Sequence, residues 1–458
     1  MSFNFDIANE ELDEEYADFA SAQADHAADE PLDGDGRAAE PASSVKGREH
    51  TLDELIDALP ARISYSTLQI PLDAQKGAKQ ARDEDKRRWT IVARRDLFDA
   101  RFQMIYASDD EEEADGESRN GSAVPEGHEA GLVEADSDLV PGVYEGGLKT
   151  WECSLDLIAA LDAHDRRDDG ESSDTVPFHW LGGLSVVELG CGTAIPACFL
   201  LARLMCVEID DARQETILQL CDFNEQVLKL VTLPNLILAW YTSPASSAFR
   251  ASVAGASGES EGIELDLVPA TGEVDLSDEL LAAFKESLKH RKVALRFFSG
   301  PWKDLETCSR ATSSQMAPSR APQLLEADLL LSSETIYSPP DQTALLDILQ
   351  RLCKASSTHN ASVRALSEKL QTSGLQESSA LDHSGLHVAA QPLTPRRNAE
   401  VLGTLALISA KVLYFGVGGG VHAFRQSIEK AGGWSHEVRK VTSGVGRCVL
   451  SIGWSADN

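Results

Sequence analysis

The sequence predicts an α/β protein whose main domain is a mostly parallel sheet covered by helices on both faces. From residue 142 onward, short apolar runs typical of buried strands alternate with longer runs that have helical periodicity. These strand runs are apolar throughout, as expected for strands buried on both faces. The connection after the first of them is rich in glycine, which favours a doubly wound sheet with a ligand at its carboxyl edge.

The alternation predicts the elements in order. We expect strands at 184–189, 216–221, 235–240, 293–298, 327–332, 404–415 and 446–454, and helices at 195–206, 223–232, 341–353 and 421–431. Two stretches rich in Ser, Ala, Gly and Pro interrupt this main domain, which spans 140–458. We interpret them, at about 242–290 and 355–400, as surface insertions, with LSDELLAAFKESL as a candidate helix in the first.

The first part of the chain contains two strongly acidic runs. Residues 1–40 hold thirteen Asp and Glu against one Arg, and residues 109–138 hold twelve against one Arg. Such runs cannot bury enough apolar surface to offset the entropy of ordering, so we expect a disordered tail over 1–48 and a disordered linker over 107–139. Helical and strand patterns within 49–106 predict an extension that packs on the main domain; the alternative is an arm ordered only with a partner.

Composition limits the function classes. The net charge of −33 opposes direct binding of nucleic-acid phosphates and suits a basic protein partner. No apolar run approaches the roughly 20 residues of a membrane span. The N-terminus carries acids where a targeting peptide carries bases, so we expect a protein of the cytoplasm and nucleus without membrane contact. We also expect a monomer. The eight cysteines form no C-x-x-C pair and have no His at zinc-ligand spacing, which predicts no metal site.

The segment VVELGCGTAIP, residues 186–196, carries the glycine turn. Gly190 and Gly192 follow the first strand, and Ile195 stands where a dinucleotide fingerprint has its third glycine. Glu188 precedes the turn, where a carboxylate would repel a pyrophosphate but attract a cationic amine or sulfonium. The turn therefore favours S-adenosylmethionine over a nicotinamide dinucleotide; a purely structural turn is the alternative.

A second acid is expected after the next strand, where it would bind ribose hydroxyls. Asp222 in TILQLCDFN follows the cleaner strand and is preferred to Glu208 and Asp210 in CVEID. A helix cap at the start of 223–232 is the other interpretation of Asp222.

Several segments together resemble one family. They are YEGGLKTWECSLDLIAAL, VVELGCGTAIP, DFNEQVLKLVTLPN, RFFSGPWKDL, LLLSSETIYSPPDQTALL and KVLYFGVGGGVHAF. The chain is similar over about 50–106 and 140–458, insertions excluded, to the protein-histidine N-methyltransferases of the methyltransferase-like protein 18 group. SETIY and YFGVGGG are the narrowest of the shared motifs. The resemblance implies a seven-strand, mostly parallel Rossmann-like methyltransferase sheet, S-adenosylmethionine as cofactor, and a histidine of a large-subunit ribosomal protein as substrate.

The resemblance also implies the cofactor site. Gly190 would underlie the methionine part, Cys221 to Phe223 would meet ribose and adenine, and Gly300 and Trp302 would flank the ring. The predicted cofactor residues are Thr150, Trp151, Glu152, Cys153, Ser154, Glu188, Gly190, Gly192, Cys221, Asp222, Phe223, Gly300, Trp302 and Ser333. Trp151 has an alternative as a core residue of an amphipathic helix, and Trp302 as a loop plug. Ala194 departs from the pattern, since the family commonly has glycine or another small residue there.

Glu334 and Tyr337 of SETIY follow the central strand and are the predicted catalytic residues. Histidine is mostly neutral near pH 7, so methyl transfer to it needs a group that fixes the imidazole tautomer rather than a strong base. Glu334 would accept from the distal N–H, and Tyr337 would stack or use its hydroxyl. The alternatives are a helix-capping acid for Glu334 and a half-buried tyrosine for Tyr337.

GVGGG at 416–420 is either a flexible rim or a tight connection. Rival functions are a protein-lysine methyltransferase of the same fold, a cofactor-binding ribosomal-protein chaperone and, more remotely, an NAD-dependent oxidoreductase.

Overall fold

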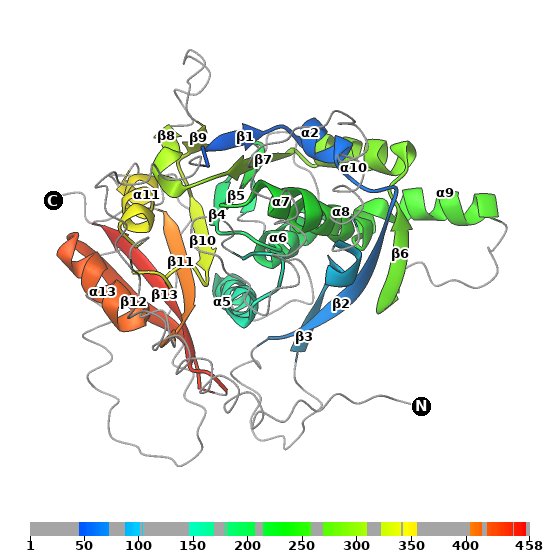
Figure 1. Ribbon diagram of the computed structural model, residues 1–458. Helices are drawn as coiled ribbons and strands as arrows, with labels where there is room; N and C mark the ends of the chain where they lie inside the picture. The colour runs from blue at the N-terminus through cyan, green and yellow to red at the C-terminus, as the bar shows by residue number, and fades with distance from the viewer. Residues whose placement is uncertain are drawn as a thin grey trace, which may run out of the picture.

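A computed structural model gives the architecture. It describes residues 45–72, 88–100, 103, 146–168, 178, 181–206, 214–257, 269–308, 322–339, 342–354, 404–414, 419–442 and 444–454. The acidic runs at 1–40 and 109–138 lie outside the described residues, as does the predicted insertion at 355–400. Figure 1 shows one large sheet with helices on both sides and a smaller sheet beside it.

The large sheet has eight strands in the order β1-β7-β5-β4-β10-β11-β13-β12. Their bounds are β1 Arg48–His50, β4 Ser185–Leu189, β5 Thr216–Asp222, β7 Val293–Ser299, β10 Leu329–Ser333, β11 Leu405–Lys411, β12 Gly433–Val441 and β13 Arg447–Trp454. β7, β5, β4, β10 and β11 are parallel neighbours, and β13 is antiparallel to both β11 and β12. The predicted α/β class with a mostly parallel sheet is confirmed. The predicted count of seven strands is one short, because β1 adds an antiparallel edge strand beside β7.

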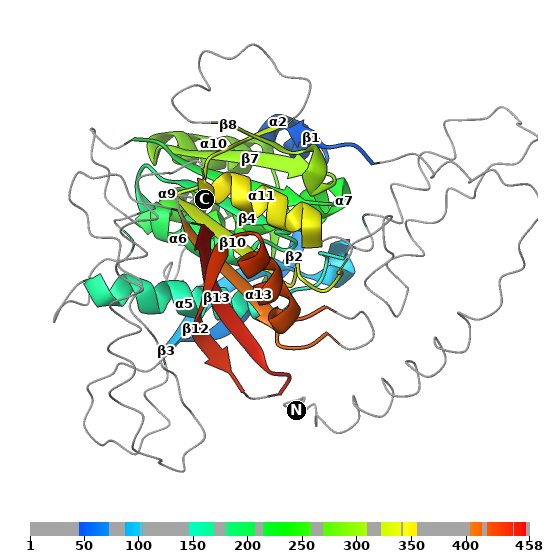
Figure 2. The same ribbon diagram turned by 90° about the vertical axis from the view of Figure 1, so that its left-hand side faces the viewer.

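Helices cover both faces of this sheet (Figures 1 and 2). On one face lie α5 (Glu152–Asp168), α6 (Ile195–Cys206), α8 (Leu233–Tyr241) and α10 (Asp278–His290), and on the other α11 (Gln342–Lys354) and α13 (Val421–Lys430). Strand β4 serves both cores: Val186 packs on the α6 side, whereas Val187 and Leu189 pack on the α11 side. Side chains alternate along a strand, so an apolar run without alternation is what a strand between two cores requires.

The N-terminal extension forms most of a second, antiparallel sheet, β3-β2-β6, of β2 (Arg62–Leu72), β3 (Arg88–Arg95) and β6 (Thr271–Asp275). Ile63, Tyr65 and Ile70 of β2 belong to the same core as α6 and α8, so this segment packs on the main domain. β6 and α10 come from the stretch interpreted as an insertion, which also holds η4 (Pro244–Ser246) and α9 (Ser247–Ser257). The candidate helix in that stretch is confirmed as α10, with Phe284 fully buried.

The smaller elements belong to the N-terminal extension and to the segment that follows β7. Helix α2 (Leu52–Asp57) of the extension begins with a capping box between Thr51 and Glu54. The loop after β7 holds η5 (Trp302–Asp304), and β8 (Glu306–Cys308) pairs with β9 (Gln323–Leu325). Among the described residues, no helix combines the length and apolar character needed to cross a membrane.

The strand predicted at 235–240 is wrong: these residues form α8. The chain runs from α7 (Glu225–Val227) through a π-helical turn, η3 (Leu228–Thr232), directly into α8. Every residue from Leu233 to Trp240 is buried, so the segment has no polar face to reveal its helical period. A short apolar run of this kind fits a buried strand and a buried helix equally well. Strand β12 was missed because most of its residues are partly exposed, so its sequence lacks the apolar run of a buried strand.

Candidate functional site

The predicted site residues gather at one edge of the large sheet. Since β7, β5, β4, β10 and β11 are parallel, their carboxyl ends meet there. Ligands of open α/β sheets bind outside this edge. The loops that leave it carry the glycine turn, the Asp222 segment, the Gly300 segment, SETIY and the residues after Lys411.

The glycine turn adopts a backbone that favours glycine. Gly190 and Gly192 have φ of 63° and 52°, in the left-handed region. A Cβ on Gly192 would lie 3.1 Å from the carbonyl oxygen of Gly147, which comes from the YEGG segment. Ala194 also has a positive φ, 51°, so the departure from the family is accommodated at a cost of about 1–2 kcal/mol.

Asp222 ties the glycine turn to the end of β5. Its Oδ2 accepts a hydrogen bond from the Gly192 backbone N–H (2.9 Å), and its Oδ1 accepts from the Asn224 N–H (3.0 Å). Asn224, not Asp222, is the N-cap residue of α7, so capping is not the role of Asp222. The Asn224 side chain donates to the Gly146 carbonyl (2.9 Å), which brings the YEGG segment onto the same site. Glu208 and Asp210 lie outside the described residues.

Glu188 is buried beneath the turn, with 2% of its surface exposed. Its Oε2 accepts a hydrogen bond from the Ala197 N–H (3.0 Å), in the first turn of α6. Burial raises the pKa of this carboxyl to about 8, against the usual 4.5, although the Ala197 hydrogen bond opposes the shift. Glu188 therefore has a structural partner in α6; a contact with the cofactor stays a prediction.

The segment from Thr150 to Ser154 borders the turn. The Thr150 hydroxyl shares a hydrogen bond with that of Thr193 (3.0 Å) in the turn, and the Ser154 hydroxyl donates to the Trp151 carbonyl (2.7 Å). Trp151 precedes α5 and is 36% exposed, so the core alternative for this tryptophan is wrong. Cys153 is fully buried and Glu152 is exposed in the first turn of α5. Their contact with a cofactor stays a prediction.

The Gly300 loop packs against both the Asp222 segment and the N-terminal strand. The Gly300 N–H donates to the carbonyls of Asp222 and Phe223 (3.1 and 3.0 Å). A Cβ on Gly300, whose φ is 102°, would lie 2.8 Å from the Gly47 Cα. Trp302 is partly buried and packs against the α11 core, which agrees with a loop plug and leaves its predicted adenine contact untested.

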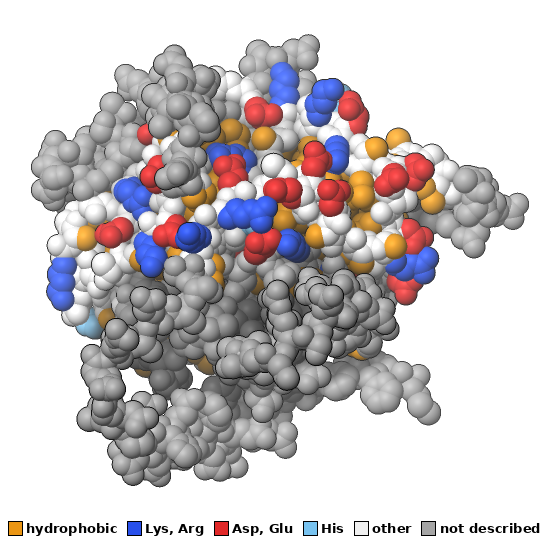
Figure 3. All heavy atoms as spheres, turned by 45° about the horizontal axis from the view of Figure 1, so that its top comes forward, with side chains coloured by type: hydrophobic (Ala, Val, Ile, Leu, Met, Phe, Trp, Pro, Cys, Tyr) orange, Lys and Arg blue, Asp and Glu red, His pale blue; other side chains and the backbone are white. Residues whose placement is uncertain are grey.

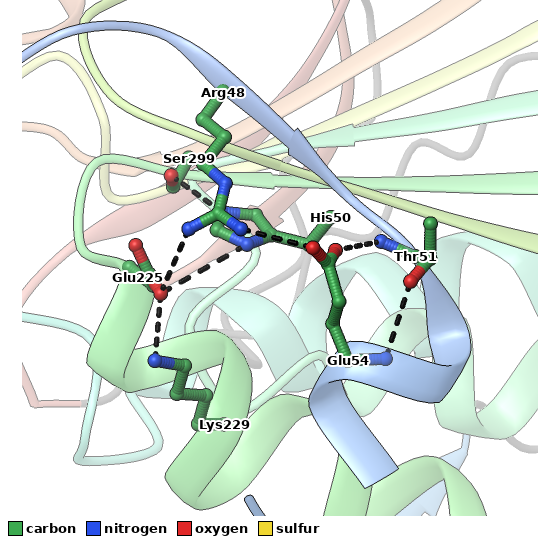
Figure 4. A network of polar contacts seen from close by, with 7 residues as sticks. All are labelled: Arg48, His50, Thr51, Glu54, Glu225, Lys229 and Ser299. Carbon is green, nitrogen blue, oxygen red and sulfur yellow. Dashed lines mark hydrogen bonds and ion pairs between the residues drawn. The ribbon is translucent and has the colours of Figure 1, made fainter. Parts of the chain in front are cut away.

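Figure 4 shows how the N-terminal strand is fixed beside this loop. The His50 Nε2 shares a hydrogen bond with the Ser299 hydroxyl (2.7 Å), one residue before Gly300. Glu225 forms ion pairs with Arg48 (3.6 Å) and Lys229 (2.6 Å), and its Oε1 lies 3.9 Å from the His50 Nδ1. Burial lowers the pKa of His50, although Glu225 opposes this. The N-terminal extension thus reaches the predicted adenine side of the site.

Glu334 lies at the end of β10 in a largely buried polar cluster. Its backbone has φ of 57°, and its N–H donates to the Ser409 carbonyl (3.0 Å). Its Oε1 is buried and has no hydrogen-bond partner among the described residues, while the Lys411 Nζ lies 3.8 Å away. Burial raises the pKa of the Tyr414 hydroxyl, and the Glu334 carboxylate raises it further.

The remaining predicted residues flank this cluster. Tyr337 is half-buried, and a Cβ on Gly419 would lie 2.2 Å from its carbonyl oxygen, so the GVGGG connection packs tightly on SETIY at that point. Ser333 ends β10 and pairs with Ser409. Phe223 is half-buried after β5, and the Cys221 carbonyl accepts from the Cys191 N–H (2.9 Å). No group of three or more His, Cys, Asp or Glu among the described residues is placed to hold a metal.

Several residues that shape the site had no sequence prediction. The buried Thr232 hydroxyl donates to the Gly192 carbonyl (2.7 Å), and the buried Asn235 amide donates to the Thr193 carbonyl (2.8 Å). Both come from the π-helical turn and the helix after it, a backbone feature frequent at functional sites. Lys411 and Tyr414 belong to a motif that had been singled out, whereas nothing in the sequence marked His50.

The chain is similar to several curated proteins. It is 27% identical over 368 residues to histidine protein methyltransferase 1 of Saccharomyces cerevisiae, covering 79% of this chain and 76% of that protein. It is 27% identical over 429 residues to the Schizosaccharomyces pombe protein of that name, covering 92% and 90%. It is 28% identical over 319 residues to the Bos taurus homolog, covering 69% of this chain and 57% of that protein.

No protein-family model matches the chain. The relatives nevertheless agree in name, and the similarity covers most of the length of this chain and of both yeast proteins. These relatives support the membership of this chain in the family of histidine protein methyltransferases.

Proposed function

We propose that this protein-histidine methyltransferase transfers the methyl group of S-adenosylmethionine to a histidine of a basic protein of the large ribosomal subunit. The observation that carries the proposal is the Glu334 carboxylate, which follows the central strand and keeps one buried oxygen without a hydrogen bond among the described residues. That oxygen could accept a hydrogen bond from an N–H of the group that receives the methyl, which supports the binding of an imidazole at this point.

The described residues fit such a cofactor, which supplies a methyl group activated on a sulfonium. At Gly192 a side chain would press on the YEGG backbone, so glycine lets the two segments that border the predicted cofactor site pack closely. Asp222 lies beside this turn, where its carboxylate would accept hydrogen bonds from the ribose hydroxyls. Gly300, Trp302 and Ser333 at the same edge would complete the binding surface.

On the acceptor side, the residues have to bind a neutral imidazole and align its lone pair. Alignment and exclusion of water supply most of the acceleration in such a displacement. Glu334 would accept a hydrogen bond from the distal ring N–H, which leaves the lone pair on the attacking nitrogen. The charge that develops on the ring during transfer would be stabilised by the same carboxylate. Tyr337, on the loop that follows, would position the ring by stacking or through its hydroxyl.

The charge distribution supports a basic substrate. The runs at 1–40 and 109–138 have net charges of −12 and −11, by subtraction of one Arg from thirteen and twelve acids, out of −33 for the chain. In contrast, Figure 3 shows basic and acidic side chains interspersed over the described surface that carries β1, α2 and α10. Attraction of a basic protein would therefore come mainly from the two acidic runs.

Amino-acid analysis tests the proposal. Large-subunit ribosomal proteins from cells without this protein are incubated with the enzyme and S-adenosylmethionine labelled in its methyl group, and the products are hydrolysed in acid. The proposal predicts label in methylhistidine alone, and none with Gly192→Arg. Label in methyllysine would identify the enzyme as a lysine methyltransferase instead. Tight S-adenosylhomocysteine binding without any labelled product would favour the chaperone.

A further inference from the structure

Three side chains at the ends of β10 and β11 form a compact group with Trp151, which directly precedes α5. The Lys411 ammonium lies 4.3 Å from the centroid of the Trp151 ring and 5.9 Å from that of Tyr414. It lies 3.8 Å from the Glu334 Oε1. The backbone N–H of Lys411 donates to the Tyr414 hydroxyl (3.3 Å), which fixes this ring at the end of its own strand. One cation thus faces two aromatic rings and one carboxylate.

Glu334, Trp151 and Tyr414 together have the chemistry of a cation site, which we refer to as the cation cage. Aromatic faces attract an ammonium through their quadrupoles, and a carboxylate attracts it by charge. The attraction is strengthened by low solvent exposure: the side chains of Glu334 and Lys411 are 11% and 19% exposed. The Glu334 Oε1 has no hydrogen bond among the described residues, and the Lys411 ammonium, 3.8 Å away, balances its charge.

We propose that Lys411 determines acceptor specificity: by filling the cation cage with the chain's own ammonium, it keeps out a substrate lysine and leaves room for a neutral imidazole. This inference rests on the proposed function, in which the acceptor binds beside Glu334. It adds that the selection of histidine over lysine depends on a residue that does not itself react.

The chemistry of the two acceptors explains why such a residue would select between them. In either case an N–C bond forms from a nitrogen lone pair while the C–S bond breaks, and its electron pair stays on sulfur as a neutral thioether. The positive charge passes to the acceptor nitrogen. A proton then leaves from the other ring nitrogen of the imidazole, or from the nitrogen of the amine. Both reactions therefore start from a neutral nitrogen.

Histidine and lysine reach that neutral state at very different cost. At pH 7 about three quarters of free imidazole is neutral, against roughly one in 2,500 of lysine side chains, from ordinary pKa values of about 6.5 and about 10.4. A lysine enzyme must therefore first bind an ammonium, which an unbalanced carboxylate favours, and then remove its proton. With Lys411 beside Glu334, the carboxylate charge is already balanced, and a second ammonium would meet a like charge.

The first experiment examines the cage without methyl transfer. Tetramethylammonium chloride is added at constant ionic strength, and its binding is followed by saturation-transfer NMR. We expect a signal with Lys411→Met, in which the ammonium is gone but the length is kept, and no signal with the native chain or Lys411→Arg. The signal should disappear again in the double variant Lys411→Met, Glu334→Gln. Lys440→Met, which removes an exposed lysine two strands away, is the matched control and should behave as the native chain.

The second experiment measures specificity. It uses the ribosomal-protein peptide that carries the methylated histidine and the same peptide with lysine at that position. Lys411→Met should raise the kcat/KM for the lysine peptide at least tenfold over the native enzyme, whereas Lys411→Arg and Lys440→Met should not. Equal unfolding temperatures of the variants would exclude misfolding as a cause.

The outcomes distinguish the role of Lys411 from the proposed methyl transfer to histidine. Lys411→Met that neither binds tetramethylammonium nor gains activity on the lysine peptide would overturn the role of Lys411. Binding in the cage without any gain on the lysine peptide would also overturn it, since the cage would then not lie at the acceptor position. A native enzyme that methylates no histidine would instead refute the proposed function, and the NMR result would still decide whether Lys411 fills a cation cage.

Discussion

The backbone N–H of Gly192 donates a hydrogen bond to the Asp222 carboxylate, with 2.9 Å between nitrogen and Oδ2. This contact joins the turn after β4 to the end of β5, two neighbouring parallel strands. Asn224 and Gly300 attach to the same segment through their own N–H groups. The contact places a conformation that favours glycine next to the acid expected to bind ribose.

Gly192→Arg should weaken S-adenosylhomocysteine binding roughly 100-fold or more, which corresponds to about 2.7 kcal/mol. The long side chain would be strained at a φ of 52° and would meet the Gly147 backbone. Isothermal calorimetry provides the measurement. Gly444→Arg is the control, because Gly444 also has a positive φ, 66°, but a Cβ there has no neighbour within 4 Å. Native affinity in Gly192→Arg would mean that the turn does not face the cofactor.

Glu334→Gln should reduce methyl transfer by roughly 100-fold while cofactor affinity stays within a few-fold. The glutamine keeps the shape but loses the charge that favours a proton on the distal ring nitrogen. Tyr337→Phe should lower the rate in the same way, by a smaller factor. Single-turnover rates measured beside calorimetric cofactor affinity separate the two effects. A large loss of cofactor affinity with native turnover at saturation would instead assign Glu334 to the cofactor pocket.

The free energy of unfolding should decrease between about pH 4.5 and about pH 8 because of Glu188. Its pKa in the folded chain is about 8, so the folded state keeps a proton that the unfolded state loses above 4.5. The unfolded state then binds fewer protons, and stability falls by at most about 1.4 kcal/mol per pH unit. Urea unfolding near pH 5.5 and near pH 7.5 measures the change.

Glu188→Gln is the comparison for this pH dependence, because the amide keeps an acceptor for the Ala197 N–H without a titrating proton. The stability of this variant relative to the native chain should rise with pH across the same interval. The difference between the two proteins removes the contribution of His50, whose lowered pKa acts in the opposite sense below about pH 6.5. A difference that does not change with pH would show that Glu188 is ionised in the folded protein.

Removal of residues 1–44 should leave the unfolding temperature within about 2 °C of the native value. At the start of the described residues, Lys46 and Gly47 contact the Gly300 loop, and the Gly47 N–H donates to Asp304 (2.9 Å). Removal of residues 1–50 should be clearly destabilising, because it also deletes β1 and the His50–Ser299 hydrogen bond. Calorimetric melting compares the two truncations.

The shorter truncation also tests the role proposed for the acidic tail. Association with a basic substrate should become slower and less dependent on salt, since part of the electrostatic attraction is lost. Stopped-flow binding at two ionic strengths measures this. An unfolded product after removal of 1–44 would show that the tail contributes to the core.

Much of the fold and part of the site could be predicted because the relevant signals are local. The apolar run before Gly190 and the strand before Asp222 identify the two loops that meet, and parallel strands bring their ends together. α8 could not be recognised as a helix, because its fully buried residues leave no polar face. The eighth strand was missed because β1 has only three residues and pairs with β7 across about 250 positions, a relationship no local pattern records.

In the site, too, some residues have a local sequence signal and others do not. Glu334 was selected by its motif, but its neighbours come from two other segments, Trp151 from one and Lys411 and Tyr414 from the other. Thr232 and Asn235 support the glycine turn from a helix that was partly assigned as a strand. Contacts of this kind depend on packing between distant elements and follow only from the folded chain.

The most direct test of the central claim is intact-protein mass spectrometry of the large ribosomal subunit from cells with and without this protein. The account predicts that a single ribosomal protein loses the mass of one methyl group, and that fragmentation assigns the group to a histidine. Expression of the native chain should restore it, and Gly192→Arg should not. Identical spectra from the two cell types, or a lost methyl group that maps to lysine, would contradict the account.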